Sequence, residues 1–307
     1  MSALDEITQA IQMDFLKSAG FLKSPQLPEF LYHYTTADGL HGILQNQELW
    51  STNVLYMNDA AELTDAVSVA KDILDTERKG HEESLELWAV LSLLETHLEQ
   101  LPLDYFVTCF CQDDDLLSQW RAYGPQGGYC LGFRGSDLAT SAGTFECRLV
   151  KVIYDRAEKE ERIRRRIEIV LRHLKRAVGM PGQNLKALNP LASCIAGLFA
   201  GILCEMKNQA FKPEEEWRLI CLQPSLHSVP AGHTTKPLHF RISNGAVVPY
   251  VKLAWLAENG KPTLPIAKIR CGPGPHPGLA QQAVRDLLRC KGFLDLPVEG
   301  SNVPLRT

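Results

Sequence analysis

The sequence lacks any long hydrophobic run, although 45% of its 307 residues are hydrophobic. A membrane-spanning helix needs about 20 consecutive apolar residues. The longest candidate, LASCIAGLFAGILC at 191–204, has 14 residues and many small side chains, which is typical of a helix buried inside a protein. The N-terminal segment MSALDEITQAIQMDF contains acidic residues early and no basic stretch before an apolar run. We therefore expect no secretory signal, no membrane association and a cytoplasmic protein.

The sequence also lacks C-x-x-C pairs, the spacing typical of zinc sites and dithiol redox centres. Its nine cysteines are odd in number and spread through apolar segments, which predicts free, buried thiols in a reducing compartment. Cys109 and Cys111 share one face of a predicted strand without metal-ligand spacing, so we expect both to pack in the core and predict no metal site.

Neither sign of charge is in excess, because 32 Lys and Arg residues against 36 Asp and Glu residues give a net charge of −4. This excludes a strongly basic nucleic-acid-binding protein at the level of the whole chain, although not a local basic patch. The ordinary charged fraction of 22% excludes a mainly disordered chain, because apolar burial can offset the entropy of ordering. The length allows one large domain or two small ones.

What the sequence does contain is an ordered series of β-rich and helical segments. Alternating and β-prone residues predict strands near 30–36, 48–52, 104–111, 129–133, 145–154, 216–222, 238–243, 247–256, 265–272 and 298–306. Apolar residues at helical spacing predict helices within 1–27 and near 38–45, 60–78, 82–99, 116–124, 156–178, 190–208 and 279–292. This order predicts an α+β fold whose sheet is built from both ends of the chain, with helices inserted between.

The helix predicted near 156–178 has an apolar stripe and a basic face. The basic face carries Arg162, Arg164, Arg165, Arg166, Arg172, Lys175 and Arg176. Interleaved glutamates favour a solvated helix face, and contact with a nucleic acid or an acidic protein is the alternative.

Two segments near the N-terminus combine structural and chemical signals. In the strand LYHYTT, Leu31, His33 and Thr35 share one face, so His33 is either a hydrogen-bonded core residue or a ligand-binding one. In the segment MNDAAE, Asn58 is typical of a helix N-cap with Glu62 as its capping-box partner. The cap does not explain why two carboxylates and an amide gather beside the strands.

The segment SQWRAYG places Trp120 and Tyr123 on one helical face, three residues apart. Both rings are explained by the core, or by a stacking wall for a planar heterocycle. The following glycines, Gly124 to Gly128, allow a close backbone approach to a ligand but are weak evidence for phosphate binding.

The strongest local signal is the run EEEWRLI at 214–220, where three acidic residues lead directly into a strand. Alternation places Glu216 and Arg218 on one face and Trp217 on the other. Three adjacent carboxylates repel one another unless they are exposed or paired with cations. Solvation explains Glu214 and Glu215, whereas Glu216 beside Arg218 is also a candidate for chemistry.

These segments, together with IAKIRCGP and SNVPLR, occur in the order seen in a large bacterial group, and the sequence resembles that group over about 30–135 and 210–306. The group is catalogued as a domain of unknown function, number 2971, and includes abortive-infection proteins. It resembles in turn an H-Y-E-like branch of the ADP-ribosyltransferase superfamily, whose members bind NAD in a split β-sheet. The resemblance implies an ADP-ribosyltransferase-like core over 28–307, with an N-terminal helical extension at 1–27 and a helical insert at about 155–210.

The resemblance also implies site roles. His33 matches the strand histidine that binds the adenosine ribose, with Thr35 assisting, and Tyr123 or else Trp120 stacks on nicotinamide. Glu216, with Glu214 as the second choice, stabilises the oxocarbenium-like transition state. Arg121 and Arg218 pair with the pyrophosphate or orient the glutamate. The remaining expected cofactor-binding residues are Tyr34 and Asn58.

We therefore expect an enzyme that cleaves NAD as a substrate and transfers ADP-ribose to a macromolecule, as a toxin or phage-defence effector. The acceptor remains open between protein, RNA and DNA, transfer remains open against NAD hydrolysis or RNA 2′-phosphate transfer, and the sequence specifies no oligomeric state. Two alternatives belong to other classes. One is a metal-dependent phosphodiesterase or nuclease that uses Asp59, Glu62, Glu214 and Glu216. The other is a nucleotide-binding module without turnover.

Overall fold

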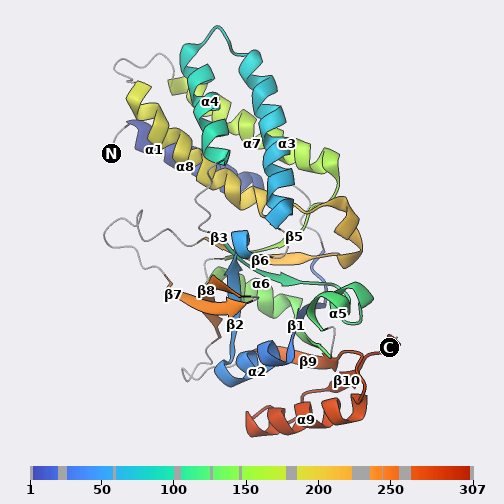
Figure 1. The fold of residues 1–307 in the computed structure, drawn as a ribbon. Coiled ribbons are helices and arrows are strands. Elements are labelled where there is room, and N and C mark those ends of the chain that lie inside the picture. Colours follow the sequence, from blue (N-terminus) through green and yellow to red (C-terminus); the bar gives the residue numbers. More distant parts are fainter. Residues whose placement is uncertain are drawn as a thin grey trace.

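The computed structural model describes residues 3–19, 26–57, 60–99, 105–124, 127–144, 147–177, 185–222, 236–243, 245–255 and 264–304. Within these residues the chain forms two β-sheets, a thick helical layer on one side and shorter helices around the other end (Figure 1). The mixed α+β architecture predicted from the order of the segments is confirmed.

The larger sheet has six strands in the order β5-β6-β3-β2-β8-β7, and every neighbouring pair is antiparallel. Its strands are β5 (Cys147–Lys151), β6 (Trp217–Leu222), β3 (Tyr105–Phe110), β2 (Glu48–Asn53), β8 (Ala246–Ala254) and β7 (Leu238–Ser243). Strands from the two ends of the chain meet where β2 pairs with β8. The sheet is therefore built from both ends of the chain, as predicted.

The smaller sheet has four strands in the order β1-β4-β9-β10. Its strands are β1 (Phe30–Thr35), β4 (Tyr129–Arg134), β9 (Ile266–Cys271) and β10 (Val298–Gly300), the last running parallel to β9. An isolated bridge joins the two sheets, where the N–H groups of Tyr32 and Cys111 each donate to the other residue's carbonyl at 2.9 and 2.8 Å. The end of β3 is thereby fixed beside β1.

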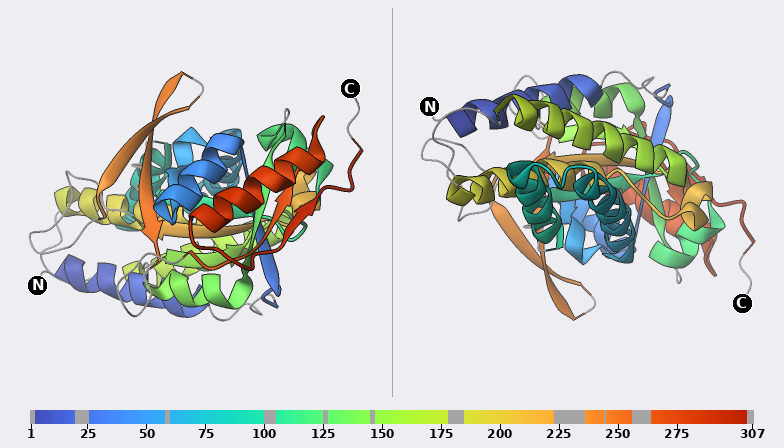
Figure 2. Two further views of the ribbon diagram at one scale, coloured as in Figure 1. Left: turned by 90° about the horizontal axis from the view of Figure 1, so that it is seen from below. Right: turned by 90° about the horizontal axis from the view of Figure 1, so that it is seen from above.

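Five helices cover one face of the larger sheet (Figures 1 and 2). They are α1 (Ala3–Ala19), α3 (Ala60–Lys79), α4 (Leu85–Glu99), α7 (Arg156–Ala177) and α8 (Leu185–Leu203). The alternation of β6 explains the arrangement, since Ile220 faces this helical core whereas Leu219 faces a second core. The segment predicted as an N-terminal extension thus contributes Ile11 and Phe15 to the same core as the predicted insert.

The second core joins the opposite face of the larger sheet to the smaller sheet. It is closed by α2 (Ala37–Asn46), α6 (Gly135–Thr144) and α9 (Pro277–Cys290). Helix α2 begins where the Thr36 hydroxyl accepts a hydrogen bond from the Gly39 N–H at 3.2 Å, and it buries Leu40, Ile43 and Leu44.

Several segment boundaries differ from the prediction. No helical pattern indicated α6, because GSDLATSAGT is rich in small and polar residues and contributes only Leu138 and Ala142 to the apolar core. The buried helix α8 lies at Leu185–Leu203 and includes Pro190, rather than at 190–208. Residues 209–214 form the short 3₁₀ helix η2 (Gln209–Glu214), and up to residue 304, where the description ends, the terminal strand is limited to β10.

The expectation that all nine cysteines are free is wrong for one pair. Cys147 on β5 and Cys221 on β6 form a disulfide, because the two strands pair with these residues directly opposite each other, with their Cα atoms 4.2 Å apart. Sequence spacing did not indicate the pair, because the partners are 74 residues apart and become neighbours only through the sheet. None of the other seven cysteines, all within the described residues, forms a disulfide, and Cys194 and Cys290 are exposed rather than buried as expected.

The basic face predicted on α7 is partly internal. Arg166 is 6% exposed, its guanidinium donates to the Phe15 carbonyl and lies over the Phe15 ring, and burial lowers its pKa to about 10. Arg162 pairs at 3.0 Å with the buried Glu205, which also binds Arg148 at 2.7 Å. The rest of the predicted face is exposed, with Arg165 paired to Glu161 at 2.6 Å. Arg162 and Arg166, which were expected on a solvated face, therefore bind neighbouring parts of the fold and hold α7 against them.

Across the part of the chain that the structure describes, no helix combines the length and apolarity that a membrane crossing requires.

Candidate functional site

The structure contains an open groove of about 850 Å³. One wall is formed by β1 and the segment between β3 and α5 (Leu117–Tyr123), and the other by η2 and the residues that lead into β6. Polar and charged residues predominate in the lining, which comprises Tyr32, Gln112, Asp113, Asp114, Leu116, Gln209, Ala210, Lys212, Pro213, Glu214 and Glu215. The groove thus brings together the N-terminal strand signal and the acidic run of the sequence.

The β1 wall is organised around Tyr32 and Lys268. The Lys268 Nζ lies 4.9 Å from the Tyr32 ring centroid and 2.7 Å from an Asp114 carboxylate oxygen. That same oxygen lies 3.2 Å from the Arg270 Nε, so two cations balance the Asp114 charge. Burial raises the pKa of Tyr32, against the opposing effect of Lys268, so the phenol stays protonated at neutral pH.

Tyr34 and Asp115 fix the segment that carries Asp113 and Asp114. The Tyr34 hydroxyl donates to the Asp113 carbonyl and accepts from the Leu116 N–H, both at 2.9 Å. The Asp115 carboxylate accepts from the Trp120 Nε1–H at 2.8 Å and from the Asn302 N–H at 2.7 Å. This side of the groove is therefore preorganised by these four hydrogen bonds.

The opposite wall contains a four-membered charge cluster. The Lys207 Nζ donates to Glu214 at 2.8 Å and to Glu216 at 2.9 Å, and the Arg218 Nε donates to the other Glu216 oxygen at 2.6 Å. Lys207, Glu216 and Arg218 are each less than 5% exposed. Both oxygens of Glu216 are therefore held by buried cations, whereas Glu214, with 12% of its side chain exposed, reaches the groove.

The ionised form of Glu216 is strongly favoured. Burial alone would raise the pKa of Glu216, but the charges and hydrogen bonds of Arg218 and Lys207 outweigh it and lower the pKa to about 2. Its backbone is fixed as well, because the Glu216 N–H donates to the Tyr154 hydroxyl at 2.8 Å. Within this cluster the geometry gives Glu216 a supporting position and leaves Glu214 as the carboxylate that a ligand in the groove can touch.

His33 lies on the other side of β1 from Tyr32 and Tyr34. Its Nδ1–H donates to the Cys109 carbonyl at 2.9 Å, and its ring lies 5.9 Å from that of Phe110 in the second core. Burial lowers the pKa of His33, so the ring is neutral at pH 7. Phe110, whose ring His33 contacts, pairs with Trp217 across β3 and β6, and both lie on the second-core face of the larger sheet. Glu216 precedes Trp217 and therefore points to the other face. His33 and Glu216 thus lie on opposite faces of this sheet.

The aromatic candidates of α5 belong largely to the protein interior. Trp120 is 2% exposed and packs edge-on against Tyr34 with centroids 4.7 Å apart, so it does not form the stacking wall considered from its spacing. Tyr123 is half-buried against the same cluster, and Arg121 is exposed. The aromatic ring that lines the groove is that of Tyr32.

The glycines after α5 serve backbone packing. A Cβ at Gly124 would lie 2.4 Å from the Gly128 Cα, and the Gly128 carbonyl accepts from the Gly272 N–H at 2.8 Å. The close approach expected of these glycines is therefore made to the protein's own backbone. Thr35, at the end of β1, is half-buried and lies against Gly39 of α2.

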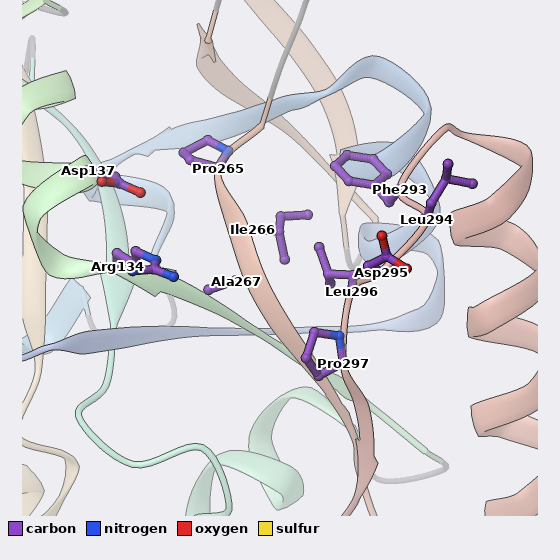
Figure 3. Close-up of a pocket in the computed structure, with 10 residues that line it drawn as sticks. All are labelled: Arg134, Asp137, Pro265, Ile266, Ala267, Phe293, Leu294, Asp295, Leu296 and Pro297. Atoms are coloured by element: carbon purple, nitrogen blue, oxygen red, sulfur yellow. The ribbon is translucent and has the colours of Figure 1, made fainter.

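A second pocket, of about 380 Å³, lies beside β9 (Figure 3). Figure 3 shows Arg134 and Asp137 on one side of β9, and Phe293 and Leu294 of the segment after α9 on the other. Its described lining is mainly apolar and includes none of the residues expected at the site. The larger groove is thus the better candidate.

Three of the candidate residues have side chains outside the described part of the chain. Asn58 and Asp59 lie outside the described residues, as does the side chain of Glu62. Among the residues that are described, no group of three or more His, Cys, Asp or Glu side chains is arranged to hold a metal ion.

Sequence reasoning missed Tyr32, Asp114, Lys207 and Lys268. Tyr32 adjoins the expected His33, and alternation assigned the two residues to opposite faces without showing which face opens to a groove. Lys207 had no local signal, because it lies at the predicted end of a buried helix and acquires its role through tertiary contacts.

One family model, described as a protein of unknown function (DUF2971), matches residues 119–219, about one third of the chain. The matched segment runs from α5 into β6 and includes Lys207, Glu214, Glu216 and Arg218. The match supports the resemblance to that family but differs in extent, because it includes the helical segment at about 135–210 that the resemblance left out and covers little of 30–135 and 210–306. No curated protein and no solved structure matches the chain significantly.

Proposed function

We propose that the protein is an ADP-ribosyltransferase-like enzyme that cleaves NAD in the groove between β1 and η2, with Glu214 as the carboxylate that faces the reacting ribose. The observation that carries the proposal is the position of Glu214, which lines the groove while Lys207 holds one of its oxygens at 2.8 Å. The sequence alone favoured Glu216, and its burial moves this role to its neighbour two residues earlier.

The chemistry requires a fixed negative charge beside the ribose. When the bond between the ribose C1′ and the nicotinamide nitrogen breaks, its electron pair leaves with nicotinamide and positive charge develops on the sugar. A preorganised carboxylate stabilises that charge more in the transition state than in the ground state. Loss of one such electrostatic group costs about 3–4 kcal/mol in other enzymes, so loss of Glu214 is expected to cost at least that order.

The remaining groove residues support binding of a nucleotide. A volume of about 850 Å³ lies within the range of small-molecule sites. The Tyr32 ring supplies an aromatic surface, and Lys212 at the rim supplies a cation for a phosphate. Asp114, across the groove from Glu214, supplies an acceptor for ribose hydroxyls.

The fold adds support of a general kind. The two sheets, joined only at the Tyr32–Cys111 bridge among the described strands, resemble the split β-sheet that the sequence resemblance implies. His33 lies at this junction but on the far face from Glu214, so its expected contact with the adenosine ribose requires the ligand to extend past the edge of β1.

The decisive experiment incubates the purified protein with NAD labelled in the adenosine moiety, in the presence of a cell lysate. Label entering protein, RNA or DNA identifies the acceptor class, and label released only as free ADP-ribose identifies a glycohydrolase. The Glu214→Gln variant should lose nicotinamide release by at least about 10²-fold. The matched control Glu168→Gln, at an exposed position on α7, should retain it.

Three results would overturn this assignment. Full nicotinamide release by Glu214→Gln would exclude the proposed carboxylate. Calorimetric binding of NAD without release on any substrate would favour a nucleotide-binding module. Activity on phosphodiesters that is lost on chelation would favour the metal-dependent alternative, although the described residues offer no arrangement that supports it.

A further inference from the structure

We propose that Lys207 is a positioning residue that holds the groove carboxylate Glu214 in place by tying it to the buried Glu216–Arg218 pair. This inference deepens the proposed function and rests on it, because it assigns how the reacting carboxylate of the groove is kept ionised and oriented.

The hydrogen bonds of Lys207 link a buried residue to an accessible one. Its Nζ donates to Glu214 at 2.8 Å and to Glu216 at 2.9 Å, while 5% of the Lys207 side chain is exposed. Glu216 is fixed in turn by Arg218, whose Nη1 donates to the Cys204 carbonyl at 2.9 Å. The only accessible member of this chain of contacts is Glu214, at the wall of the groove.

The position of the Lys207 ammonium group is determined by several elements at once. The Lys207 N–H donates to the Ile153 carbonyl at 3.0 Å, and the Ile153 N–H donates to the Glu205 carbonyl at 2.8 Å, which fixes the segment beside the end of β5. The ammonium also lies 4.6 Å from the centroid of the Phe211 ring on η2. Contacts with the segment after β5 and with η2 therefore both restrict movement of Lys207.

The charges within the cluster balance. Lys207 and Arg218 carry two positive charges, and Glu214 and Glu216 carry two negative charges, all within one connected network. The titratable groups that face the cluster from β3 and from the end of β5 are neutral, because burial raises the pKa of Cys109, Cys111 and Tyr154. Without Lys207, two carboxylates would share a site with one cation, which favours uptake of a proton by one of them.

The test compares nicotinamide release against pH for wild type and three variants. Lys207→Met should lower the rate at neutral pH by about 10²-fold, as expected for a displaced reacting group, and should move the acid limb of the profile to higher pH. Lys207→Arg keeps the charge but alters its position, so it should lower kcat with the acid limb unmoved. Lys79→Met removes an exposed lysine that is paired with Asp75 on α3, and should leave the profile unchanged.

A double variant separates positioning from a merely structural role. Lys207→Met with Glu216→Gln restores the charge balance of the cluster and should recover most of the thermal stability that Lys207→Met loses. If Lys207 acts through Glu214, the double variant remains slow because Glu214 is still not held in place, while its acid limb returns toward that of wild type because the second carboxylate is gone. Recovery of the wild-type rate in the double variant, or an unshifted acid limb in Lys207→Met, would overturn the inference while leaving the proposed function intact. Absence of nicotinamide release by wild type would overturn the proposed function, and the inference with it.

Discussion

The backbone N–H of Glu216 donates a hydrogen bond to the hydroxyl of Tyr154 at 2.8 Å, so a residue that follows β5 fixes the start of β6. Both groups are buried. The contact sets where the charge cluster begins, and it is the only role the described structure gives to this phenol.

Tyr154→Phe removes this acceptor and leaves the buried Glu216 N–H without a partner. An unsatisfied buried donor costs about 1–3 kcal/mol, so the free energy of unfolding should fall by that amount. Urea denaturation at pH 7 measures it. A change below about 0.5 kcal/mol would show that the N–H finds another partner.

Glu216 predicts an acid-dependent loss of stability. Its pKa is about 2 in the folded protein, below its ordinary value near 4.5, so the folded state binds fewer protons than the unfolded state. The stabilisation, of order 3 kcal/mol, is fully present above pH 5 and declines as the pH falls from about 5 to 2.

The measurement is urea denaturation of wild type and Glu216→Gln at pH 7 and at pH 3. The difference in unfolding free energy between the two proteins should be large at pH 7 and should shrink at pH 3. An equal difference at both pH values would contradict the assignment of a depressed pKa to Glu216.

The Cys147–Cys221 disulfide predicts a redox-dependent stability. A cross-link over a separation of 74 residues restricts the unfolded chain, and native disulfides typically contribute about 2–4 kcal/mol. Cys147→Ser, and wild type in reducing agent, should both show that loss in denaturation curves. Alkylation and mass spectrometry of the unreduced protein check the bond directly, and detection of nine alkylated cysteines would refute it.

Trp120 and Arg121 are adjacent in sequence, but we expect their substitution to affect the stability of the fold very differently. Trp120→Ala removes a buried ring and the donor to Asp115, and should cost about 3–5 kcal/mol of stability. Arg121→Ala alters an exposed position and should change stability by less than about 0.5 kcal/mol. If Trp120→Ala instead left stability unchanged and weakened NAD binding, the stacking role inferred from its spacing would be restored.

The helical periodicity of apolar residues and the alternation of residues along strands were sufficient to predict most of the architecture. They located β1, β3, β6 and the long helices, because these segments carry strong apolar patterns. They failed for α6, whose small polar residues fold as a helix only against the second core. The Cys147–Cys221 disulfide could not be predicted for a related reason, because the pairing of β5 with β6 depends on the whole sheet.

The candidate site was predictable in part. The acidic run at 214–216 was recognised, and alternation correctly paired Glu216 with Arg218 on one face. The left-handed backbone at Glu215, with φ of 42°, was not predictable, and it follows the 3₁₀ helix from which Glu214 meets Lys207. Which of the two carboxylates reaches the groove therefore depends on a local turn that residue type does not reveal.

The helical excursion between β5 and β6 has a topological consequence. The Cys147–Cys221 disulfide links its two ends, so the segment between these cysteines is a covalently closed ring that contains α7 and α8. A protease that cuts once within this ring produces two fragments that migrate together until they are reduced. Cleavage there separates the helical layer's backbone into two pieces without releasing either strand from the sheet that carries the groove.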